Sequence, residues 1–265
     1  MMTEAQAALL TQVSAVLKTD GRIRSIWLSG SLARGVGDTW SDVDLVAQVD
    51  EADRAACLAD YGQGGAGWPD LVHAQQLHGR VLTATTVNWQ RFDVSFLTPS
   101  ELAIVDGAGL KHLAGDATAT PPDQPPSADT RAPRRIAALI TEFLRVLGLL
   151  PVAVGREEWL GAQQGYDLLR RMFIELMIEE NGVTPTVRGG AKRLNLHLSA
   201  DQRKMLEAIA PPLARRETLI SANLELARLF LDRARPLADR LDAPWPLAFE
   251  QATRRHLQRC LEVEI

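Results

Sequence analysis

The chain has 265 residues with a formal net charge of −4, and 46% of its residues are apolar while 23% are charged. This length suits one large domain or two modest ones, and the acidic balance argues against a protein that coats nucleic acid. The N-terminal segment lacks the basic start and continuous apolar stretch of a signal peptide, and no run approaches the roughly 20 apolar residues of a membrane span. Cys57 and Cys260 show no metal-type or redox-type spacing. We therefore expect a cytoplasmic protein with neither nucleic acid nor membrane as a partner.

The first half of the chain alternates between helical and extended patterns. Apolar residues at helical spacing predict a helix over residues 3–18. The segments IRSIWLSG and DVDLVAQV predict two strands, with a helix beginning between them at Ser29 or Ser31 and another helix over residues 51–60. Two more strands are predicted from RVLTATTVNW and RFDVSFL. We expect residues 1–120 to form a small mixed β-sheet flanked by helices.

The second half shows no strand pattern. A Pro- and Asp-rich segment, Gly115–Pro133, is predicted to be a linker. Five amphipathic patterns follow, the first marked by apolar residues from Ile136 to Leu150, and Ser199 begins a capping box. We expect residues 130–265 to form a helical bundle, so that the whole chain belongs to the α+β class.

Three aspartates are candidates for a functional site. Asp42 and Asp44 are two residues apart at the start of a predicted strand, so both side chains leave the same face. In the strand RFDVSFL, Asp93 lies on the polar face, opposite Phe92 and Val94. If the two strands are neighbours, three carboxylates meet. Such oxygen ligands suit one or two Mg²⁺ ions that handle a triphosphate. The alternative is a solvated strand end.

A Gly-Ser turn precedes the paired aspartates. Gly30 would let a phosphate approach the backbone closely, and Ser31 would offer a hydroxyl at the start of a helix. Arg34 follows one helical turn later, within reach of a phosphate oxygen. Ser31 is also a plausible plain helix cap, and Arg34 a plausible surface arginine.

The order of these motifs resembles the nucleotidyltransferase superfamily typified by DNA polymerase β. The segments GSLARG and SDVDL are most similar to those of small bacterial members, the aminoglycoside and lincosamide nucleotidyltransferases. The resemblance implies that Asp42, Asp44 and Asp93 are the catalytic metal ligands and that Gly30 and Ser31 bind the triphosphate. It also implies a reaction in which a substrate hydroxyl attacks the α-phosphorus of a nucleoside triphosphate and pyrophosphate leaves.

The resemblance leads to a specific functional hypothesis. We expect a Mg²⁺-dependent transfer of nucleoside monophosphate, AMP from ATP in the first instance, to a small hydroxylated acceptor such as an aminoglycoside-type antibiotic. Lys192, in the basic segment VRGGAKRLNLHLS, is a further candidate for binding the phosphates. Two alternatives stay open: transfer to a protein hydroxyl, and a non-catalytic nucleotide-binding regulatory module.

Two further roles are left open by the sequence. The general base that assists the attacking hydroxyl is either Asp93 or one of four carboxylates in the helical half, Glu157, Glu158, Asp167 and Glu175. Four aromatic residues are candidates to line a base or acceptor pocket, although core packing is the commoner role of such side chains: Trp68, Trp89, Trp159 and Tyr166.

Overall fold

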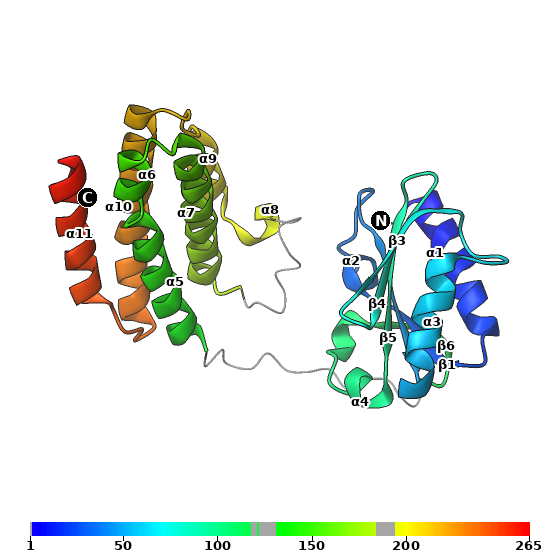
Figure 1. Cartoon of the computed structure of the whole chain (residues 1–265). Coiled ribbons are helices and arrows are strands. Elements are labelled where there is room, and N and C mark those ends of the chain that lie inside the picture. Colours follow the sequence, from blue (N-terminus) through cyan, green and yellow to red (C-terminus); the bar gives the residue numbers. More distant parts are fainter. Residues whose placement is uncertain (1, 118–120, 122–130, 184–193) are drawn as a thin grey trace. The chain divides into compact units, whose positions relative to one another are not determined.

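A computed structural model describes residues 2–117, 121, 131–183 and 194–265. The chain divides into two compact units, Met1–Pro126 and Ser127–Ile265 (Figure 1). The first unit is a β-sheet with helices, and the second contains only helices among its described residues.

The first unit is built on a six-stranded sheet with the order β3-β4-β5-β2-β1-β6. Its central pair, β2 with β5, is parallel, and the other neighbours are antiparallel. The sheet is therefore mixed, as the sequence predicted. The strands are β1 (Ile23–Leu28), β2 (Val43–Val49), β3 (Leu71–Leu77), β4 (Val81–Thr86), β5 (Arg91–Leu97) and β6 (Lys111–Gly115).

Helices α1 (Glu4–Thr19) and α3 (Glu51–Gln63) lie along the same side of this sheet (Figure 1). They pack on the apolar faces of the strands, where Val43 and Leu45 of β2 and Phe92 and Val94 of β5 are buried together with residues of both helices. The remaining helical segments are short: α2 (Gly30–Ala33), α4 (Pro99–Leu102) and the 3₁₀ turn η1 (Gly107–Gly109).

Among the described residues of the first unit, the opposite face of the sheet carries one small apolar cluster. Trp27 of β1, Val46 of β2 and Leu97 of β5 form a small cluster there with Leu102 of α4. Because successive side chains of a strand point to opposite faces, Asp44 and Asp93 belong to this second face, outside the large core. The fold thus keeps both carboxylates away from the apolar layer.

The second unit is a bundle with one continuous core. Its longest helices, α5, α7 and α10, pack on one another, and Phe143 of α5 stacks on Phe230 of α10 with ring centroids 3.7 Å apart. Ser199 caps α9 through the capping box that the sequence predicted. The helices are α5 (Ala132–Leu147), α6 (Leu150–Gly155), α7 (Trp159–Glu180), α8 (Leu194–His197), α9 (Ala200–Ala208), α10 (Arg216–Arg240) and α11 (Leu247–Leu261).

Four expectations about the chain's organisation were wrong in detail. The sequence did not predict β3 or β6. The segment taken as a linker begins on the last residue of β6 and ends inside α5, which starts at Ala132. The helix expected to reach Leu150 ends at Leu147, and α6 follows as a separate element. Finally, Ala132–Gly155 is long and apolar enough to cross a membrane by length and composition alone. Much of its apolar content packs in the bundle core, where Ile136 and Ile140 are fully buried.

Candidate active site

Asp44 and Asp93 are direct neighbours across the parallel pair of strands. The register places Asp44 of β2 opposite Asp93 of β5, so their side chains leave the same face with the strands about 4.8 Å apart. The predicted pairing of these two strands is confirmed. Both aspartates are half-buried, and two like charges directly opposite each other repel. A cation held between the two carboxylates would offset this repulsion.

The Gly30 turn lies against the same carboxylate. The Ser29 N–H donates to the Asp44 carbonyl oxygen at 2.8 Å, which ties the turn to β2. Gly30 has a φ of +65°, and a Cβ atom added to it would lie only 2.6 Å from Asp44 Cγ. A side chain at position 30 is thus excluded both by the backbone conformation and by the Asp44 carboxylate.

Ser31 has a hydroxyl that no described residue satisfies. The residue is 7% exposed, and its Oγ atom is buried with no hydrogen-bond partner. Leaving a buried polar group unsatisfied costs about 1–3 kcal/mol. The helix α2 begins at Gly30 and its N-cap is Ser29, which makes no side-chain cap hydrogen bond, so Ser31 is not the cap of α2. The hydroxyl is therefore available to a bound group in the immediate neighbourhood of Gly30.

Asp42 does not lie on the strand as expected. β2 begins at Val43, which pairs with Phe92, and Asp42 is the residue before it. The strand register therefore does not fix the Asp42 side chain on the row that Asp44 and Asp93 share. Across the described ranges, no three or more His, Cys, Asp or Glu side chains are grouped so as to hold a metal ion. Of the three carboxylates expected to lie together, the strand register pairs only Asp44 and Asp93.

The structure says less about Arg34 and Lys192, the two basic residues predicted to bind phosphate. Arg34 is exposed, and a Cβ atom on Gly109 of η1 would lie 3.7 Å from its Nη1 atom. Arg34 thus extends beside η1, and its phosphate role stays a prediction. Lys192 lies outside the described residues. The alternative bases all belong to the second unit, at or just before α7, and their role as a base is not tested.

The aromatic candidates fall into two groups. Trp68 packs against Tyr61 in the core of the first unit, with the two rings tilted at 34°. Tyr166 is fully buried in the bundle, where burial raises the pKa of its hydroxyl. Trp159 packs against the bundle core. Trp89 alone differs, because it is 79% exposed in the loop between β4 and β5.

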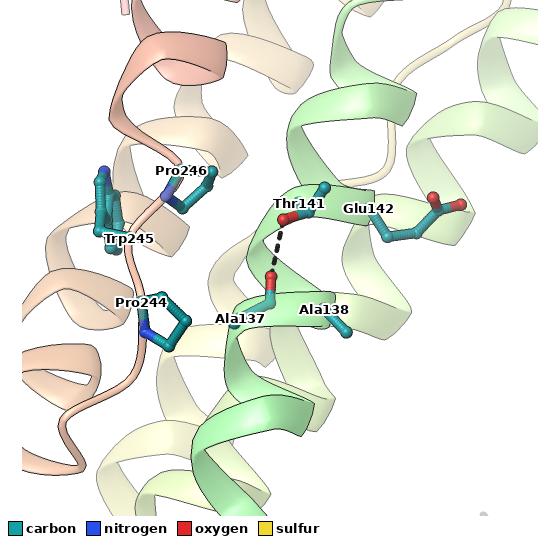
Figure 2. Close-up of a pocket in the computed structure, with 7 residues that line it drawn as sticks. All are labelled: Ala137, Ala138, Thr141, Glu142, Pro244, Trp245 and Pro246. Carbon is teal, nitrogen blue, oxygen red and sulfur yellow. Dashed lines mark hydrogen bonds between the residues drawn. The ribbon is translucent and has the colours of Figure 1, made fainter.

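The bundle has a pocket of its own, with a volume of about 470 Å³. Figure 2 shows it between α5 and the segment 244–246, with Trp245 and two prolines on one side and Thr141 and Glu142 on the other. Thr141 bonds the Ala137 carbonyl oxygen at 2.8 Å. None of the residues predicted for the chemistry lines this pocket, so the pair of aspartates and its Gly-Ser turn are the better candidate for an active site.

Comparison with known proteins gives solved structures only: no family model and no curated protein matches. The chain is similar to an aminoglycoside 6-adenyltransferase from Bacillus subtilis, with 13% identity and a TM-score of 0.44 over 96% of this chain and 98% of the other. It is also similar to a nucleotidyltransferase-like protein from Exiguobacterium sibiricum, with 12% identity and a TM-score of 0.39 over 97% and 88%. A c-di-GMP synthase from Capnocytophaga granulosa follows with 12% identity and a TM-score of 0.29 over 86% and 79%. At these levels of similarity, function has to be argued from this chain's own residues.

Proposed function

We propose that this chain is a Mg²⁺-dependent nucleotidyltransferase that moves AMP from ATP to a hydroxyl of a small acceptor. The observation that carries the proposal is the Asp44–Asp93 register, together with the glycine that packs directly on the Asp44 carboxylate. Neither feature contributes to apolar packing in the core, because both carboxylates belong to the face of the sheet opposite the apolar layer.

The residues fit a metal-bound triphosphate. Asp44 and Asp93 would hold Mg²⁺, which takes one or two carboxylates and completes its shell with water and phosphate oxygens. Asp42, two residues before Asp44, is a further candidate ligand. The unsatisfied Ser31 hydroxyl would bind a phosphate oxygen, and the bare Gly30 backbone would let that phosphate come close. When bound, the metal supplies positive charge that neutralises the triphosphate. The task left to the protein is to position the two substrates.

A small acceptor, including an aminoglycoside-type antibiotic, is the first candidate because the segments GSLARG and SDVDL resemble those of the antibiotic nucleotidyltransferases. Lys192 and Arg34 remain candidates for the phosphates, and Asp93 for the base. A protein hydroxyl as the acceptor is a second possibility. A non-catalytic module is less well supported because the chain retains all three aspartates, Asp42, Asp44 and Asp93, and a degenerate member would be expected to lose at least one.

The test is label transfer from α-labelled ATP to a panel of aminoglycosides, lincosamides and simple glycosides in the presence of Mg²⁺. The wild-type chain is expected to label one class of compound, and Asp44→Asn is expected to abolish the transfer. Asp70→Asn is the matched control, since Asp70 is exposed and precedes β3. Transfer that survives in Asp44→Asn would refute the proposed site.

A further inference from the structure

The helical unit contains a second pocket, which has a volume of about 200 Å³. Its walls come from the end of α5, from α6, from the first half of α7 and from α10. Val146, Leu150 and Ala162 are buried apolar residues of these walls, while Leu149 and Leu168 also line the pocket and are exposed to solvent. Since an apolar cavity of about 150 Å³ holds a benzene ring, this pocket has room for one ring with a small substituent.

Asn223 of α10 places a carboxamide group in this apolar wall. The residue is 2% exposed, and its Nδ2 atom donates to the Leu219 carbonyl oxygen at 2.7 Å. Among the described residues, no group donates a hydrogen bond to the Asn223 Oδ1 atom. A carboxamide oxygen accepts up to two hydrogen bonds, and a buried acceptor without one is unfavourable. The acceptor is therefore left for an O–H or N–H group that enters the pocket.

Two glycines of α7 keep this space open. Gly161 and Gly165 both line the pocket and lie one helical turn apart. A Cβ atom on Gly165 would meet nothing within 4 Å, and one on Gly161 would contact only Glu158 Cβ at 3.9 Å. Neither glycine has a positive φ, and glycine weakens a helix relative to alanine. Local folding therefore gives no reason for glycine here, whereas the bare backbone provides a flat wall for the face of a ring.

The charge of the pocket favours a neutral ligand. Among the described residues that line it, Arg145 is the only charged one. Its Nε and Nη2 atoms donate to the two carboxylate oxygens of Glu142 at 2.7 and 2.6 Å, so its charge is already matched. The remaining walls offer no partner for an ion, and burying an unpaired charge among apolar groups is costly.

We infer that this pocket binds a neutral compound with one apolar ring and one hydroxyl or N–H group, of the size and chemistry of a phenol. The volume sets the single ring, and the Asn223 Oδ1 atom sets the donor. The inference goes beyond the proposed function, because the pocket belongs to the helical unit and uses none of the residues placed at the Asp44–Asp93 pair.

The test compares phenol with toluene, which has the same number of heavy atoms but no donor. Binding to the full-length protein is measured by calorimetry and by ligand-observed NMR. We expect the wild type to bind one phenol saturably and to bind toluene about five- to tenfold more weakly, because toluene leaves the Asn223 oxygen without a hydrogen bond. Asn223→Leu removes that acceptor, so the two affinities should then agree within about twofold.

Gly165→Leu places a side chain in the pocket and should weaken phenol binding by about tenfold or more. Leucine is the better helix former, so the melting temperature should be kept or raised. Gly155→Leu is the matched control, since Gly155 is exposed, does not line the pocket, and has no atom within 4 Å of an added Cβ. It should leave phenol binding unchanged.

The inference is overturned if phenol does not bind, if the wild type binds phenol and toluene equally, or if Gly165→Leu binds phenol as tightly as the wild type. It is also overturned if the wild type is an oligomer that Gly165→Leu dissociates, because the pocket would then be covered by another chain. If Gly165→Leu does not fold, the ratio of the two affinities in the wild type and in Asn223→Leu decides.

Discussion

Alanine at position 30 tests whether the Gly-Ser turn positions the Asp44 carboxylate. A Cβ atom at Gly30 would lie 2.6 Å from Asp44 Cγ and 2.9 Å from Asp44 Cβ. Since carbon atoms in contact are about 3.5–4.0 Å apart, the carboxylate must move by about 1 Å. Misplacing a reacting group by that distance lowers the rate by about 10²-fold. The left-handed backbone adds a loss of about 1–2 kcal/mol of stability.

Gly35→Ala separates the two effects. Gly35 has a φ of +73°, so it carries the same backbone penalty, but a Cβ atom there would meet nothing within 4 Å. Both variants should therefore show similar losses in thermal unfolding, while only Gly30→Ala should lose about 10²-fold in kcat/KM for nucleotidyl transfer. If Gly30→Ala transfers as fast as Gly35→Ala, the Gly-Ser turn does not position Asp44, and the reasoning fails.

Two other variants are informative. Ser31→Ala removes a buried hydroxyl without a partner, so unfolding of the ligand-free protein should be unchanged or stabilised, while the Kd for Mg²⁺-ATP should rise by about tenfold; a clear loss of stability would show that the hydroxyl has a structural partner. Hydrogen bonds from Arg22 lower the pKa of Asp20 from 3.8 to about 2, which contributes about 2 kcal/mol of stability that is present above pH 4 and lost as the pH falls toward 2. The difference in unfolding free energy between the wild type and Asp20→Asn should narrow over that range, and a constant difference would contradict the assignment.

The sequence predicted the parts of the fold whose apolar pattern is strong. In β5 the alternation of Phe92 and Val94 with Asp93 is reproduced in the burial of the strand, which is why the face of Asp93 could be predicted. In contrast, β3 has no such alternation, because it is an edge strand with few buried side chains. Its pattern therefore gave no signal for a strand.

The candidate site was predictable from residue types and only partly from positions. The order of Gly30, Ser31 and the aspartates pointed to a metal-bound triphosphate, but strand pairing is a long-range property, and only the structure gives the register of Asp44 with Asp93. The first residue of β2, Val43, could not be predicted exactly, so Asp42 was placed on the strand.

The central claim is that Asp44 and Asp93 form a metal-dependent triphosphate site. Titration calorimetry with ATP, with and without Mg²⁺, tests it most directly on the wild type, Asp93→Asn and the control Asp70→Asn. We predict that ATP binding requires Mg²⁺ in the wild type and in Asp70→Asn and that it is lost in Asp93→Asn. Binding that is independent of Mg²⁺, or that is as tight in Asp93→Asn as in the wild type, would contradict it.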